Sequence, residues 1–102
     1  MTTKVCAVDE LKPGGVKKVM ADGTPVAVFD LNGAYFAIDD TCSHALSSLS
    51  EGFFEDGLAE CPKHGSQFDV RTGQPVSLPA TRPVRTHTVT VKGDDIYVEV
   101  TP

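Results

Sequence analysis

The sequence lacks long apolar runs and clusters of basic residues. No stretch approaches the roughly 18 apolar residues of a membrane-spanning helix, and residues 1–6 form no signal-peptide core before Asp9 and Glu10 follow. The longest basic feature is Lys17-Lys18, and 14 acidic against 9 basic residues give a net charge of −5. We therefore predict a cytoplasmic protein that binds neither a membrane nor nucleic acid, because both partners favour clustered lysine and arginine.

The chain also lacks an even set of cysteines. Its three cysteines are Cys6, Cys42 and Cys61, whereas the disulfide framework of a secreted protein normally uses an even number. A reducing compartment is therefore the better interpretation. A disulfide between Cys42 and Cys61 stays open at this point, although it would leave the nearby His44 and His64 unexplained.

Helix signals are weak, and the sequence pattern is typical of an all-β protein. Asn32-Gly33 separates two apolar runs, and this pair favours a type I′ hairpin turn because both of its central positions need positive φ. Two further hairpins are predicted over residues 52–60 and 86–100, the second from its alternation of apolar and polar residues. Short helical turns are expected near residues 9–12 and 43–50. With no linker or repeat in the chain, we predict a single domain, residues 1–102, of antiparallel sheets packed as a sandwich or partial barrel.

Two segments that interrupt the strand pattern hold most of the metal-binding side chains. They carry Cys42-Ser43-His44 and, after sixteen intervening residues, Cys61-Pro62-Lys63-His64. Each segment supplies one thiolate and one imidazole, and such donors suit an iron–sulfur cluster or zinc rather than magnesium or calcium. Common zinc modules place both cysteines together and both histidines together, so the alternating order favours iron–sulfur but leaves zinc open.

The residues around these ligands resemble one known family. The run Cys-Pro-Lys-His-Gly-Ser-Gln-Phe-Asp at residues 61–69, with Thr72-Gly73 after it, resembles the second cluster-binding loop of Rieske proteins. Cys42-Ser43-His44 resembles the first loop. The likeness extends from residue 25 to the C-terminal hairpin, and it is strongest to the ferredoxin components of bacterial ring-hydroxylating dioxygenases.

The Rieske resemblance implies a fold, a cofactor and a ligand set. The fold would be an antiparallel β-sandwich or partial barrel with a small cluster-binding subdomain of two loops, at about residues 40–80. The cofactor would be one [2Fe–2S] cluster per chain. Cys42 and Cys61 would bind one iron as thiolates, and His44 and His64 would bind the other through ring nitrogens.

The resemblance also bears on the residues beside the ligands. It places Ser66 near the cluster sulfurs and Pro79 in a loop that covers the cluster. High-potential respiratory members carry an extra disulfide and a tyrosine near a ligand sulfur, where this chain has Ser47, Lys63 and Phe68. Fewer hydrogen bonds to sulfur stabilise negative charge less, so we predict a potential at the low end of the Rieske range of roughly −150 to +300 mV.

The sequence shows no candidate catalytic site, and we predict that the protein is not an enzyme. The family implies a one-electron carrier between an NAD(P)H-dependent flavoprotein ferredoxin reductase and the terminal Rieske oxygenase of an aromatic-ring dioxygenase system. A monomer is expected. The alternatives are a Rieske-like accessory subunit, such as that of an assimilatory nitrite reductase, and a zinc-stabilised module without redox function.

A few notable residues lie outside this pattern. Cys6 is expected to be a small residue of a strand, and His87 a partly buried residue near a strand end. Leu49 is expected either in the core or at an apolar docking rim. The pair Asp39-Asp40 is interpreted as turn or surface acids.

Overall fold

A computed structural model describes residues 2–43, 47–63, 65–78 and 82–101 of the chain. Two short 3-10 turns are the only helical elements in these residues, and neither has the length or apolar character that crossing a membrane requires. The elements are β1 (Thr2–Ala7), η1 (Val8–Glu10), β2 (Val16–Ala21), β3 (Thr24–Leu31), β4 (Ala34–Asp39), η2 (Leu49–Glu51), β5 (Phe54–Glu55), β6 (Leu58–Glu60), β7 (Gln67–Asp69), β8 (Thr86–Lys92) and β9 (Asp95–Glu99). The all-β fold class is confirmed.

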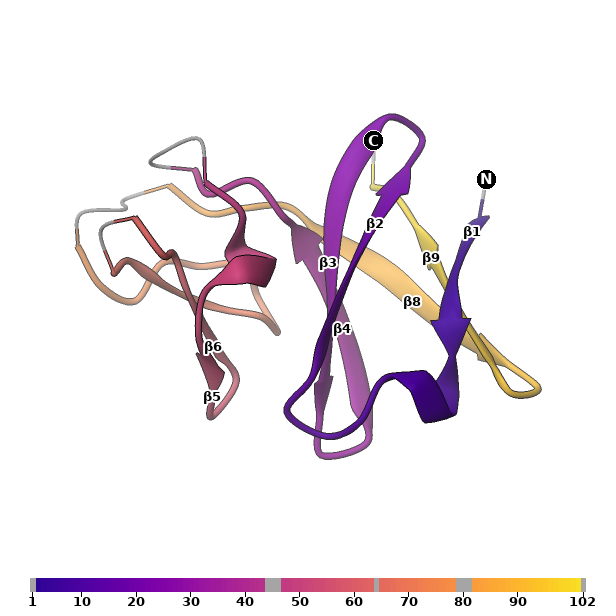
Figure 1. The fold of residues 1–102 in the computed structure, drawn as a ribbon. Helices are drawn as coiled ribbons and strands as arrows, with labels where there is room; N and C mark the ends of the chain where they lie inside the picture. Colours follow the sequence, from indigo (N-terminus) through magenta and orange to yellow (C-terminus); the bar gives the residue numbers. More distant parts are fainter. Residues whose placement is uncertain (1, 44–46, 64, 79–81, 102) are drawn as a thin grey trace.

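The strands form one large and one small antiparallel sheet. The large sheet has the order β1-β9-β8-β4-β3-β2 and curls into a nearly closed barrel, which brings its edge strands β1 and β2 toward each other (Figure 1). The small sheet has the order β5-β6-β7. It belongs to the inserted segment, residues 40–84, which leaves the large sheet after β4 and returns to it at β8.

The predicted hairpins are present, and their turn residues have the expected backbone conformation. Asn32 and Gly33 have φ of 53° and 92°, and they join β3 to β4. Asp56 and Gly57, with φ of 54° and 79°, join β5 to β6. The last hairpin pairs β8 with β9, and its strands run one residue further into the turn than the alternation indicates. Asparagine, aspartate and glycine tolerate this left-handed region better than other residues.

Strand β3 separates two hydrophobic cores. Its apolar residues alternate between the two sides: Val26 and Val28 face the interior of the barrel, while Ala27 and Phe29 face the inserted segment. All four are fully buried. This two-sided burial explains why the strand reads as a continuous apolar run instead of an alternating one.

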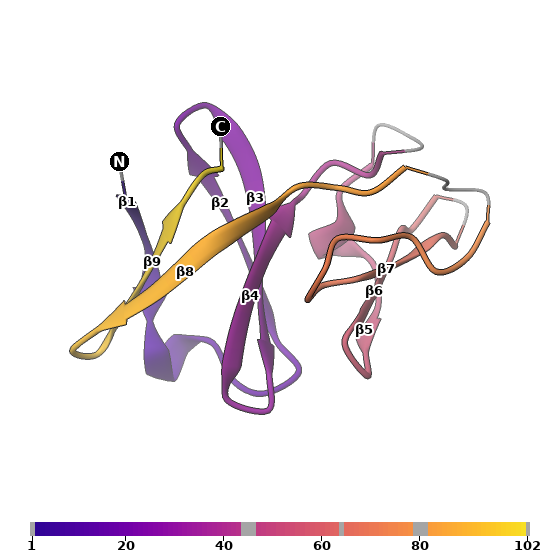
Figure 2. The same ribbon diagram turned by 180° about the vertical axis from the view of Figure 1, so that it is seen from behind.

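The inserted segment packs on one side of the barrel, as Figures 1 and 2 show from opposite directions. The Phe29 and Phe54 rings lie 4.6 Å apart, centroid to centroid, and join the large sheet to the small one. The segment begins and ends at neighbouring strands, because Ala37 of β4 pairs with His87 of β8 and the Asp39 amide donates to the Arg85 carbonyl at 3.0 Å. The barrel therefore holds the segment at both of its ends.

Candidate metal centre

The first cysteine lies in a loop that is closed at its base. Cys42 is 4% exposed, and its amide donates a 2.9 Å hydrogen bond to the Ser47 carbonyl. Thr41 and Ser48 form an antiparallel bridge just outside this bond. The backbone on both sides of residues 44–46 is thus held in a hairpin-like arrangement that fixes the position of the Cys42 thiol.

The second cysteine lies in a tighter loop of the same kind. The Cys61 amide donates to the Ser66 carbonyl at 2.7 Å, and the Gly65 amide donates back to the Cys61 carbonyl at 3.0 Å. Gly65 has φ of +74°, the left-handed region that favours glycine. Cys61 is 1% exposed and Ser66 is fully buried, and the proximity of Ser66 to cluster sulfurs stays a prediction.

Both thiols belong to one hydrophobic cluster between the barrel and the small sheet. The disulfide alternative is wrong, because none of the three cysteines, all of which the structure describes, is in a disulfide. Leu49 is 1% exposed within the same cluster, so it is a core residue and not part of a docking rim. The buried members are Ala27, Phe29, Ile38, Cys42, Leu49, Ala59, Cys61, Phe68, Val70 and Val84.

A third part of the inserted segment contacts both cysteine loops. The Ser43 hydroxyl donates a 2.6 Å hydrogen bond to the Arg82 carbonyl. The Gln67 amide donates to the Ser77 hydroxyl at 2.9 Å. Residues 77 and 82 thereby join the chain beyond the second loop to Gln67, which directly follows that loop, and to Ser43, which is next to Cys42.

The two cysteine donors that the structure describes fit the predicted iron–sulfur cluster. Two buried thiols come from two closed loops on one hydrophobic cluster, which is the chemistry that a thiolate-bound iron requires. The other two predicted ligands, His44 and His64, and the covering residue Pro79 lie outside the described residues. Within the described part of the chain, no three histidine, cysteine or acidic side chains are grouped as a metal site.

Asp40 fastens the base of the first loop. Its carboxylate accepts hydrogen bonds from the Ser48 hydroxyl at 2.7 Å and the Ser50 amide at 2.9 Å, and it pairs with the Lys18 ammonium at 3.4 Å. Burial raises the pKa of Asp40, but these hydrogen bonds and the lysine charge outweigh burial and hold the pKa below its ordinary value. With 1% exposure, Asp40 is not the surface acid that the sequence suggested.

Asp39 fastens the two ends of the inserted segment to the C-terminus. Its carboxylate accepts hydrogen bonds from the Arg85 guanidinium at 3.2 Å and from His87 Nε2 at 2.9 Å. The Thr101 amide donates to His87 Nδ1 at 3.0 Å, so Nε2 carries the ring proton and is the donor to Asp39. His87 is buried near the start of its strand, as predicted, but sequence reasoning missed this network.

We expect Asp39→Asn to lower the free energy of unfolding by about 2 kcal/mol at neutral pH, because it removes charge-assisted hydrogen bonds. Burial raises the pKa of Asp39, but the bonds from Arg85 and His87 prevail and leave the pKa lowered. The stabilisation is therefore complete above the unfolded-state pKa of about 3.9 and is lost as the pH falls through the folded-state pKa.

Thermal unfolding of wild type and Asp39→Asn at several pH values measures this effect. The difference between the two proteins should be constant near neutrality and shrink below about pH 4. Asp94→Asn, at an exposed turn residue, is the matched control and should follow the wild type. A difference that persists unchanged at the acid end would contradict the carboxylate's role.

Comparison with known proteins decides which cofactor these loops hold. The family model described as the Rieske [2Fe-2S] domain matches residues 1–88. The chain belongs to the Rieske [2Fe–2S] domain family. This Rieske domain therefore carries a single [2Fe–2S] cluster, and the zinc alternative is set aside.

Relatives of this Rieske domain are ferredoxin components. A 3-phenylpropionate/cinnamic acid dioxygenase ferredoxin subunit from Photorhabdus laumondii is 48% identical, over 94% of this chain and 91% of the relative. The ferredoxin of carbazole 1,9a-dioxygenase from Nocardioides aromaticivorans superposes with a TM-score of 0.92 at 40% identity, over 96% of both chains. A chain in the complex of reduced oxygenase and oxidized ferredoxin of carbazole 1,9a-dioxygenase matches with a TM-score of 0.91 at 41% identity, over 95% of this chain and 91% of that one. This Rieske domain is accordingly an electron-transfer component and not a catalytic enzyme.

Proposed function

We propose that this Rieske domain carries single electrons from an NAD(P)H-dependent flavoprotein ferredoxin reductase to the terminal Rieske oxygenase of an aromatic-ring dioxygenase system. The observation that carries the proposal is the likeness, over nearly the whole chain, to ferredoxin subunits of such systems. The carbazole complex of an oxygenase with its ferredoxin supports an oxygenase as the electron acceptor. We further propose that the whole chain is one domain that acts as a monomer in the cytoplasm.

The ligand set that we propose comprises Cys42 and Cys61 on one iron and His44 and His64 on the other. When bound, the cluster supplies a site that gains and loses one electron. Two neutral imidazoles in place of two thiolates remove two negative charges, which makes reduction easier than in clusters with four cysteines. The buried positions of Cys42 and Cys61 on one hydrophobic cluster support the thiolate half of this set.

The residues around the thiols place the expected potential at the low end of the Rieske range. Phe68 is fully buried in the same hydrophobic cluster, and its side chain has no hydroxyl to donate to a ligand sulfur. Ser47 and Lys63 stand where high-potential members have a disulfide, as the family resemblance indicates. We therefore expect a midpoint below about 0 mV, within the range of roughly −150 to +300 mV for such centres.

Electron paramagnetic resonance before and after dithionite reduction tests the cofactor and the function together. We expect a rhombic signal that appears only on reduction, with two irons and two acid-labile sulfides per chain. A redox titration of the same signal gives the midpoint potential. A protein without sulfide would contradict the proposed function, and a midpoint in the upper half of the Rieske range would contradict the argument from Phe68.

A further inference from the structure

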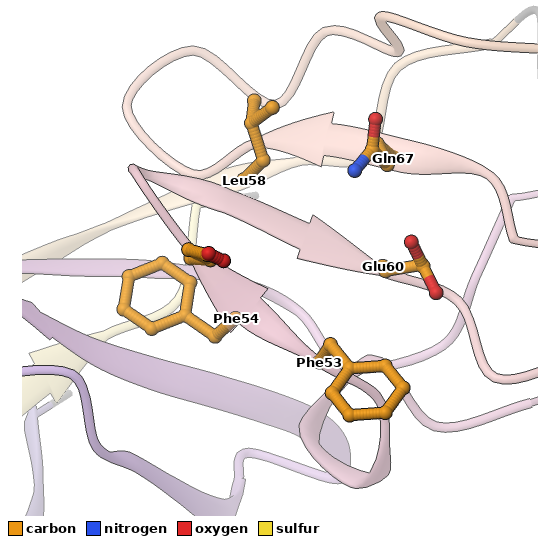
Figure 3. A pocket seen from close by; sticks show the side chains of 6 residues that line it. Phe53, Phe54, Leu58, Glu60 and Gln67 are labelled. Carbon is orange, nitrogen blue, oxygen red and sulfur yellow. The ribbon is translucent and has the colours of Figure 1, made fainter.

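The small sheet has one face that the rest of the described chain leaves partly exposed. Ala59 and Phe68 pair across β6 and β7 and are fully buried toward the barrel. Because side chains alternate along a strand, their neighbours point to the opposite side. A hollow of about 320 Å³ lies there, lined by Phe53, Glu55, Leu58, Glu60 and Gln67 and also by Phe54, whose ring packs toward the barrel on Phe29 (Figure 3).

One row of side chains crosses this face at its end nearest the second cysteine loop. Glu60 pairs with Gln67, and the Glu60 amide donates a 2.7 Å hydrogen bond to the Phe53 carbonyl. Figure 3 shows the side chains of Gln67, Glu60 and Phe53 following one another across the strands. Glu60 immediately precedes Cys61. A protein that binds this row is therefore held beside the loop that carries the proposed cluster ligand.

The chemistry of the hollow is acidic and aromatic. Phe53 is 77% exposed, an unusual state for so large an apolar side chain. Glu55 and Glu60 add two carboxylates, and the described lining contains no lysine or arginine to neutralise them. The cation that follows the small sheet, Arg71, is already bound to Asp69 at 3.0 Å.

An arginine side chain suits an aromatic ring, a carboxylate and an amide that lie close together, as Phe53, Glu60 and Gln67 do here (Figure 3). Its planar guanidinium stacks on an aromatic ring, pairs with a carboxylate through two parallel hydrogen bonds, and still has N–H groups to donate to an amide oxygen. A lysine ammonium is a more strongly hydrated point charge and lacks the flat face. The Glu60 side chain lies between those of Phe53 and Gln67 (Figure 3).

A related ferredoxin is found in complex with its oxygenase. We propose that this hollow receives an arginine side chain of the terminal oxygenase and so anchors that protein beside the second cysteine loop. The inference rests on the proposed function, because it needs a partner that exchanges electrons with the cluster. The net charge of −5 acts in the same direction, since it attracts basic surfaces in general. The hollow adds a defined contact to that general attraction.

The test measures the dissociation constant of the reduced-cluster protein for two purified partners, the terminal oxygenase and the flavoprotein reductase of its own system. The variants are Phe53→Ser and Glu60→Gln, with Met20→Ser and Glu99→Gln as matched controls on the large sheet. Met20 is 58% exposed and Glu99 is exposed, so all four changes alter surface side chains. We expect the two hollow variants to raise the dissociation constant for the oxygenase about tenfold or more, while the controls stay within about twofold.

Double-mutant cycles identify the partner's residue. Each exposed arginine of the affected partner is replaced by alanine and combined with Glu60→Gln, and one arginine should show clear non-additivity. Unchanged binding of the oxygenase by Phe53→Ser and Glu60→Gln overturns the inference, as does the absence of any coupled arginine.

The failure of the inference and the failure of the proposed function are separable. Iron content, the reduced EPR signal and the midpoint potential of each variant are measured first, and they should equal those of the wild type. If the wild type binds neither partner, the proposed function has failed. If the wild type binds a partner and the hollow variants bind it equally well, only the arginine site is wrong.

Discussion

Replacement of Cys61 by serine is expected to leave the purified protein without its iron–sulfur cluster. Cys61 is 1% exposed and shares one hydrophobic cluster with Cys42, the other proposed thiolate ligand. A serine hydroxyl nearly preserves the shape of the side chain but is a hard oxygen donor, and iron–sulfur centres are held by soft thiolates. Cys42→Ser should have the same effect, because each cysteine supplies half of the thiolate set.

The third cysteine provides a control for this experiment. Cys6 is 7% exposed, but it lies in the barrel's own hydrophobic cluster with residues such as Leu11 and Ile96. We expect Cys6→Ser to keep full iron and acid-labile sulfide and the reduced EPR signal. The iron and acid-labile sulfide content per chain of the three variants shows which cysteines bind the cluster. Full cluster content in Cys61→Ser would contradict the ligand assignment, and loss in Cys6→Ser alone would move the site into the barrel.

Gly73→Ala is expected to destabilise the protein strongly. Gly73 has φ of +78°, and a Cβ atom at this position would lie 2.2 Å from the Val84 carbonyl oxygen. That oxygen cannot withdraw easily, because the Val84 amide is itself hydrogen-bonded to the Gly73 carbonyl at 2.9 Å. The left-handed backbone and the overlap together should cost about 3 kcal/mol or more.

Gly93→Ala separates the two contributions to this cost. Gly93 has φ of +60°, and an added Cβ there meets no atom within 4 Å. Its alanine variant should lose only the backbone contribution of about 1–2 kcal/mol. In a domain of this size each kcal/mol lowers the melting temperature by about 4–8 °C. Equal melting temperatures for the two variants would show that the approach of Val84 to Gly73 is not a constraint.

The turns were the most predictable parts of the molecule, because they depend on local sequence. Asn32-Gly33 requires a left-handed backbone at two successive positions, and few other turns suit that pair. The edge strands were predicted less well: Cys6 was expected in a strand, but the bounds of β1 and the whole of β2 were not predicted. Lysines break their apolar pattern, as in Val16-Lys17-Lys18-Val19, and neighbouring strands supply the order that the local sequence does not.

The interactions that position the site were beyond prediction from sequence for a physical reason. Asp39 and Asp40 look like a hydrophilic pair at the end of a strand. Asp39 instead binds Arg85 and His87, which lie 46 and 48 residues further along the chain. Nothing near Asp39 in the sequence encodes that distance. The hollow beside Glu60 likewise exists only after β5, β6 and β7 pair, since its lining residues come from separate strands.

The adjacency of β4 and β8 makes this protein modular. The two ends of the inserted segment are joined by one backbone hydrogen bond, from the Asp39 amide to the Arg85 carbonyl. The pairing of β4 with β8 therefore depends on the position of these ends and not on the length of the segment. Loop-closure entropy grows slowly, by about 0.6 kcal/mol for each doubling of a flexible segment. Insertions at exposed turns within residues 40–84 should therefore cost the barrel little, provided that the segment still covers the core face of β3 around Phe29.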